Sequence, residues 1–188
     1  MNAVLDASAS PRHRMTEDEY LRLPEDGNKW ELVEGEPVAV PTSFDHDLIK
    51  MLLLSRLLPI AMPLGYVTGG EAGCRMRGGN IRIPDVSFTR RERISEVRPQ
   101  PGFGAAAPDL CVEILSPSEE PADVARKVDE YFESGATLVW HLFPQTRTLR
   151  VFATPTVSVE RGPEDDLDGG TLLPGFRCRV GDLFDTGL

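Results

Sequence analysis

The chain has 188 residues, of which 40% are hydrophobic and 27% are charged, as in an ordinary globular domain. Lys and Arg number 20 against 30 Asp and Glu, so the formal net charge of -10 argues against non-specific binding to nucleic acid or anionic membrane. A bound metal ion would still supply local positive charge for a phosphate group. No apolar run approaches a membrane span of about 18 residues, and no secretory signal is present, so we expect a cytoplasmic protein.

Residues 1–14 are predicted to form a flexible tail, and residues 15–188 a single domain. The domain begins with a short helix over residues 15–23, in which Thr16 and Glu19 have the spacing of a capping box. Two short strands are predicted next, around a turn at Glu34 and Gly35, in the segment WELVEGEPVAV.

A longer helix follows, capped by Ser43 or Asp45. Its apolar residues recur at spacings of three and four, and they are Leu48, Ile49, Leu52, Leu53 and Leu57. Pro59 and Pro63 are predicted to end this helix, because proline lacks the backbone N–H that a helix interior needs.

The second half of the chain is predicted to be rich in strands. The predicted elements are paired strands at 66–77 and 81–89 around Gly78-Gly79, a buried strand at 109–115, a helix at 123–134 and a hairpin at 138–143 and 148–153. This order fits a mixed sheet flanked by helices, in an α/β or α+β domain.

Three acidic residues lie in apolar segments that read as strands: Asp85 in RIPDVSF, and Asp109 and Glu113 in PDLCVEIL. A buried charge is costly unless it is paired or binds a metal ion. Because side chains alternate along a strand, Asp109 and Glu113 are predicted to share one face. If the two strands are neighbours, Asp85 and Glu113 converge on one cation, and oxygen ligands favour Mg²⁺ or Mn²⁺.

The helix after this strand carries Lys127, about 60° from the centre of its apolar face. From this position the long side chain can reach inward to the carboxylates. The alternative is a salt bridge at i,i+4 spacing to Asp123 on a solvated face.

The order of these segments resembles the PD-(D/E)xK nuclease superfamily, and more closely its Uma2 branch of restriction-endonuclease-like proteins. The resemblance rests on WELVEGEPV, SFDHDLI, IRIPDVSF, APDLCVEILSPS, DVARKVDEYFESGA and LLPGF, in this order over residues 15 to about 184. It implies a restriction-endonuclease-like core with a central mixed sheet. It also implies Mg²⁺-dependent hydrolysis of DNA phosphodiester bonds that leaves a 5'-phosphate and a 3'-hydroxyl.

Carried over by position, the resemblance makes Asp85 and Glu113 metal ligands, together with the backbone carbonyl of Ile114. Lys127 takes the role of the superfamily's lysine, moved to the helix from the strand position that Leu115 occupies here. Further candidates for the site are His46, which the resemblance places on a helix facing it, and, as secondary candidates, Glu31 and Asp109.

Each candidate also has a purely structural interpretation. Glu113 could be the buried partner of an arginine such as Arg82, and Asp85 an acid at a turn after Pro84. Asp109 could cap a loop, His46 could occupy an ordinary helix position, and Glu31 could lie on the surface. Three neighbouring arginines could contact a phosphate backbone or lie in a solvated loop, and they are Arg90, Arg91 and Arg93. The isolated Cys74, Cys111 and Cys178 do not predict a zinc site.

Two classes of function remain open. The first is a metal-dependent endonuclease acting on DNA, and a homodimer would let two small subunits clamp a duplex together. The second is a catalytically inactive module of the same fold that binds nucleic acid or a protein partner. Metal binding distinguishes them, because only a true metal site makes the melting temperature rise with Mn²⁺.

Overall fold

The computed structural model describes residues 14–24, 28–40 and 43–187. Nearly all of the predicted tail, residues 1–14, lies outside this description. Within the described ranges, no helix combines the length and the apolar character that crossing a membrane requires.

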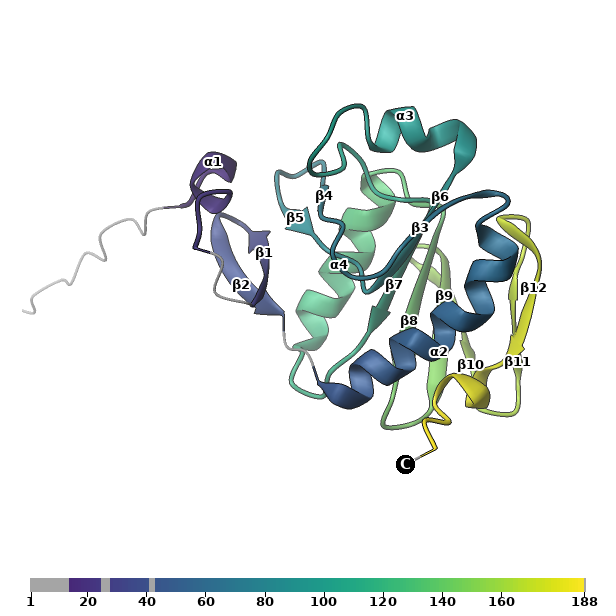
Figure 1. The fold of residues 1–188 in the computed structure, drawn as a ribbon. Coiled ribbons are helices and arrows are strands. Elements are labelled where there is room, and N and C mark those ends of the chain that lie inside the picture. The colour runs from purple at the N-terminus through teal and green to yellow at the C-terminus, as the bar shows by residue number, and fades with distance from the viewer. Residues whose placement is uncertain (1–13, 25–27, 41–42, 188) are drawn as a thin grey trace, which may run out of the picture.

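The structure is built from one large sheet, two smaller ones and helices packed against them (Figure 1). In chain order the elements are α1 (Glu17–Tyr20), β1 (Lys29–Val33), β2 (Glu36–Val40), α2 (Phe44–Ala61), β3 (Gly65–Thr68), β4 (Cys74–Arg75), β5 (Ile81–Arg82), β6 (Val86–Arg90), the 3-10 helix η1 (Arg91–Arg93), α3 (Ile94–Val97), β7 (Leu110–Ile114), α4 (Pro121–Glu133), β8 (Leu138–Phe143), β9 (Thr148–Thr154), β10 (Val157–Arg161), β11 (Asp166–Gly169), β12 (Leu173–Arg179) and the 3-10 helix η2 (Val180–Leu183).

The central sheet has the strand order β10-β9-β8-β7-β6-β3. Strands β7 and β8 pair in parallel and are joined through α4, whereas β6 pairs with β7 and β8 with β9 in antiparallel fashion. A parallel pair needs such a crossover connection, and α4 supplies it. The predicted mixed sheet flanked by helices is therefore confirmed.

Strand β7 is an inner strand of the central sheet, and its alternating side chains enter two different cores. Leu110, Val112 and Ile114 pack in the core that also contains buried residues of α2 and β12. Cys111 packs with Val128 of α4 on the other face. The predicted alternation along this strand is confirmed, and it places the Glu113 side chain on the α4 face.

Helix α2 begins at the predicted cap, because the Ser43 side chain accepts a hydrogen bond from the His46 amide at 3.2 Å. The buried residues of the helix are Ile49, Leu53, Leu57 and Ala61. The prediction that Pro59 ends the helix is wrong, since the helix continues to Ala61. A proline so close to the C-terminus removes only one late hydrogen bond and keeps a helical φ.

The predicted pairing of residues 66–77 with 81–89 is only partly correct. The Gly79 turn exists, with φ at +89°, but it joins only the short strands β4 and β5. Strand β3 pairs instead with β6 in the central sheet. Gly70, with φ at +84°, and Pro84 interrupt the two segments, so each half joins a different sheet.

The four-stranded sheet, in the order β2-β1-β5-β4, lies beside α4 (Figure 1). The hairpin of β1 and β2 turns at Glu34 and Gly35, which both have positive φ, as the favoured two-residue hairpin turn requires. The Glu34 carboxylate also forms an ion pair with the Arg126 guanidinium of α4, at a nitrogen–oxygen distance of 3.0 Å. The hairpin thereby brings Glu31 of β1 next to α4.

The capping box predicted at the start of α1 is confirmed.

Candidate functional site

The Asp85 carboxylate lies directly before β6 and against the neighbouring strand β7. Its Oδ2 atom accepts a hydrogen bond from the Ile114 amide at 2.9 Å, and its own amide donates to the Val112 carbonyl at 3.0 Å. Asp85 is 4% exposed. The expected adjacency of the two strands is therefore confirmed, and Asp85 lies beside the peptide that follows Glu113.

The geometry of β7 also bears on the prediction that the Ile114 backbone carbonyl is a metal ligand. The amide and the carbonyl of one strand residue point toward the same neighbouring strand. The next amide, of Leu115, points the other way and donates to the Leu142 carbonyl of β8 at 2.9 Å. The Ile114 carbonyl is consequently directed toward the side on which Asp85 lies.

The Glu113 carboxylate is buried under α4 and is held by two donors from that helix. The Tyr131 hydroxyl donates to Oε1, and the Lys127 ammonium lies 3.4 Å from Oε2. Burial, as the largest cause, and the charges of Asp85 and Glu31 raise the pKa of Glu113 to about 7, against the lowering effects of the Lys127 charge and of the hydrogen bond from Tyr131. Near neutral pH this carboxylate is consequently poised between its two protonation states.

Lys127 reaches inward from α4 and contacts three carboxylates. Its Nζ atom lies 3.4 Å from Glu113, 3.5 Å from Glu119 and 3.8 Å from Glu31. Burial lowers the pKa of Lys127, but these three carboxylates outweigh it and raise the pKa overall. The ammonium is therefore held protonated among acids, and the alternative partner Asp123 contacts Arg126 instead.

Glu31 belongs to a buried chain of charges next to Lys127. The Arg82 guanidinium donates to Glu31 at 3.0 Å and to Glu130 of α4 at 2.6 Å. The second Glu31 oxygen accepts from the Ile83 amide at 2.9 Å. Arg82 is thus the partner of Glu31 and not of Glu113, and Glu31 is a buried residue rather than a surface acid.

Asp85 has its own pair of basic neighbours. The His46 Nε2 atom, in the first turn of α2, lies 3.0 Å from Oδ2, and the Lys29 ammonium of β1 lies 3.4 Å from Oδ1. Burial raises the pKa of Asp85, but the hydrogen bond from His46, the Lys29 charge and the Ile114 amide together lower it. Asp85 is therefore stabilised as a carboxylate while Glu113 is not.

Asp109 lies at the opposite end of β7 from Glu113 and is fully buried. Its carboxylate accepts from the amide and the guanidinium of Arg90, both at 2.9 Å, and pairs with Arg93 at 3.0 Å. The structure does not bring Asp109 together with the other candidates. Arg90 and Arg93 are occupied by this carboxylate, and Arg91 lies over the Tyr66 ring.

A cavity of about 440 Å³ opens between β2 and the N-terminal part of α4. Lys127, Glu31, Arg82 and Glu119 line it. Asp85 and Glu113 are not among its lining residues, so Lys127 and Glu31 are the candidate residues that this cavity reaches directly.

Sequence reasoning missed four residues that support the site: Lys29, Tyr131, Arg82 as the Glu31 partner, and Glu130. Tyr131 could have been found, because it lies four residues after Lys127 and so on the same side of the helix. Lys29 could not, since nothing in the spacing of the chain relates β1 to Asp85.

Comparisons with known proteins identify a family and a similar fold. The Uma2 family, described as "Putative restriction endonuclease", matches residues 17–181, a range that includes every candidate residue above. The crystal structure of "a putative nuclease belonging to DUF820" from Anabaena variabilis is similar, with 25% sequence identity and a TM-score of 0.78, over 93% of this chain and 99% of that chain. No protein of curated function matches the chain.

Proposed function

This chain belongs to the Uma2 family, and from that membership and the buried acids we propose that it is a metal-dependent endonuclease that hydrolyses DNA phosphodiester bonds. The observation that carries the proposal is the contact between Asp85 and the Ile114 amide. It brings carboxylates from two neighbouring segments to one end of the sheet, with the Lys127 ammonium beside Glu113.

The donor atoms fit Mg²⁺ or Mn²⁺ as a cofactor. In the described part of the chain, no three side chains of His, Cys, Asp or Glu are grouped so that they could form a complete metal cage. Mg²⁺ does not need one, because proteins often bind it through one or two carboxylates, with water and substrate phosphates as the other ligands. Asp85 and Glu113 would hold the ion, with the Ile114 carbonyl as a third oxygen donor.

When bound, the ion would polarise the phosphoryl oxygen and lower the pKa of a water molecule. The chain's own residues do the rest. Lys127 carries a fixed positive charge where negative charge develops on the phosphate and the attacking water, and it acts as an electrostatic stabiliser rather than a base. His46 orients the Asp85 carboxylate through their hydrogen bond, and Tyr131 orients Glu113.

The experiment is cleavage of supercoiled plasmid and of single-stranded DNA with MgCl₂, MnCl₂ or EDTA. We expect cleavage with either metal and none in EDTA. Asp85→Asn, Glu113→Gln and Lys127→Met should each lower the rate by about 100-fold or more. Glu133→Gln is the matched control, because Glu133 is an exposed residue of the same helix α4.

Metal binding is measured separately through the melting temperature. Mn²⁺ should raise it for the parent protein but not for Asp85→Asn. Cleavage that persists in EDTA, or in Asp85→Asn, would contradict the proposal. Absence of both cleavage and Mn²⁺ stabilisation would instead favour the inactive binding module.

A further inference from the structure

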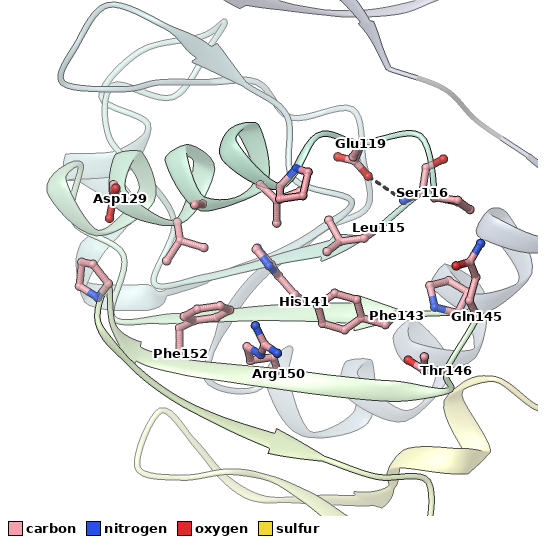
Figure 2. Close-up of a pocket in the computed structure, with 17 residues that line it drawn as sticks. Leu115, Ser116, Glu119, Asp129, His141, Phe143, Gln145, Thr146, Arg150 and Phe152 are labelled. Carbon is pink, nitrogen blue, oxygen red and sulfur yellow. Dashed lines mark hydrogen bonds between the residues drawn. The ribbon is translucent and has the colours of Figure 1, made fainter.

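A second cavity, of about 550 Å³, lies between α4 and the hairpin of β8 and β9. Its wall is mainly apolar and includes the rings of Phe143 and Phe152. Figure 2 shows His141 among the lining side chains, with Phe152 and Arg150 on one side of it and Leu115 on the other. The volume falls within the range of about 300–1,000 Å³ typical of ligand sites.

His141 is the feature that the fold alone does not explain. The side chain is 1% exposed, and its Nε2 atom has no hydrogen-bond partner in the described structure. Burial, followed by the charges of Lys127 and Arg150, lowers the pKa of His141 to about 3, so the ring is neutral at physiological pH. A buried polar atom left unpaired is unfavourable, and a ligand with a polar edge would satisfy it once a small shift of the ring brings this atom to the cavity surface.

The cavity adjoins the candidate catalytic site. His141 is the register partner of Glu113 on the neighbouring parallel strand. Glu119 lines both cavities, accepting a hydrogen bond from the Ser116 amide at 2.7 Å and lying 3.5 Å from Lys127. A group bound near His141 would therefore lie one side chain away from the Lys127 ammonium.

We propose that this cavity binds one unpaired nucleobase next to the scissile phosphodiester, with Phe152 against its face and the His141 nitrogen at its polar edge. The inference rests on the proposed nuclease function, and it makes the substrate class DNA with an unpaired nucleotide. A base inside a duplex stack cannot enter such a cavity without leaving the stack.

The chemistry of the wall favours a base over other ligands. A purely apolar group would leave the His141 nitrogen unpaired, whereas a base has both a flat π face and a hydrogen-bonding edge. Phe152 lies edge-on to His141 with the ring centroids 5.0 Å apart, and the Arg150 guanidinium lies over Phe143 at 5.6 Å. Base stacking also supplies affinity that does not depend on phosphate charge, which suits a chain of net charge -10.

The test uses a short single-stranded oligonucleotide with one 2-aminopurine, in EDTA so that metal-dependent cleavage cannot interfere. Stacking of this base on aromatic side chains quenches its fluorescence. Ala125→Trp should fill the cavity from an exposed position of α4 and weaken binding by about 10-fold or more, the order expected for one stacked base. Ala122→Trp is the matched control, because Ala122 is exposed on the same helix and lines neither cavity.

A second variant, His141→Phe, keeps a ring but removes the nitrogen, so it should alter the preference among the four bases. Unchanged quenching in Ala125→Trp overturns the cavity proposal. Plasmid cleavage with Mg²⁺ is scored independently: cleavage without quenching removes the base site and leaves the nuclease. Quenching that Ala125→Trp abolishes, without cleavage, supports the base site and removes the nuclease.

Discussion

Replacing Glu113 by Gln should stabilise the metal-free protein at pH 8 and not at pH 5. The pKa of Glu113 is raised from 4.5 to about 7, chiefly by burial. At pH 5 the folded protein keeps this proton, so its carboxyl is neutral like the Gln amide. Between about pH 4.5 and pH 7 the unfolded chain has lost this proton while the folded protein still holds it, so stability falls as the pH rises through this window. Above pH 7 the folded protein buries the charge, and the full loss of stability is present.

The magnitude follows from the displacement of the pKa. At about 1.36 kcal/mol for each factor of ten in proton affinity, the ionised side chain costs about 3 kcal/mol. The Gln amide has one acceptor oxygen for the two donors, Tyr131 and Lys127, and losing one of these bonds costs about 1 kcal/mol. The variant should be about 2 kcal/mol more stable at pH 8, whereas at pH 5, where the unfolded chain is only starting to lose this proton, the two proteins should agree to within about 0.5 kcal/mol.

The assay is urea unfolding of both proteins at pH 5 and pH 8 in EDTA. The difference between the proteins is the diagnostic quantity, because His141, with its pKa lowered to about 3, makes the stability of both rise with pH. Glu133→Gln, on the exposed side of α4, should change stability by less than about 0.5 kcal/mol at either pH. Equal destabilisation by Glu113→Gln at both pH values would refute the reasoning.

Three further predictions concern the surroundings of the site. Arg82→Met should destabilise the protein by about 3–5 kcal/mol in urea unfolding, because Glu31 keeps a buried charge without its guanidinium partner; a loss below about 1 kcal/mol would contradict this. Glu34→Asn should raise stability by about 0.5 kcal/mol, because Asn adopts the positive φ of the β1–β2 turn more readily; a lower melting temperature would count against it. Tyr131→Phe should raise the pKa of Glu113 further, so Mn²⁺ stabilisation should need a higher pH than in the parent protein; an unchanged pH midpoint would exclude the role of the hydroxyl.

The elements with regular periodicity could be predicted from the sequence. Strand β7 was recognisable because an apolar run of strand length carries a single acid inside it, and α2 because its leucines recur on one face. The division of residues 66–89 between two sheets could not be predicted. The Gly79 turn is a local signal in the sequence. The change of sheet at Gly70 and Pro84 depends instead on which distant strands are available for pairing.

The candidate site was predictable where one local rule gave a direction. The position of Lys127 beside the apolar face of its helix predicted that the side chain reaches the buried strand. In the structure its ammonium lies 3.4 Å from the Glu113 carboxylate. The contacts of Lys29 with Asp85 and of Arg82 with Glu31 join residues more than 50 positions apart. The first contact requires β1 to lie next to the residue that precedes β6, and the second requires β1 to pair with β5 within the four-stranded sheet. No spacing in the chain encodes either arrangement.

Asp109 and Glu113 show what a sequence cannot separate. Both are buried acids, four residues apart at the two ends of β7. Asp109 has its oxygens bound by the backbone amide of Arg90 and by two guanidinium groups, which are rigid donors that leave no room for an ion. Glu113 has one tyrosine hydroxyl and one ammonium on a flexible stem, at the longer distance of 3.4 Å. Such a donor can move aside for a cation, so Mn²⁺ stabilisation should survive Asp109→Asn, despite its lower melting temperature, and disappear in Glu113→Gln.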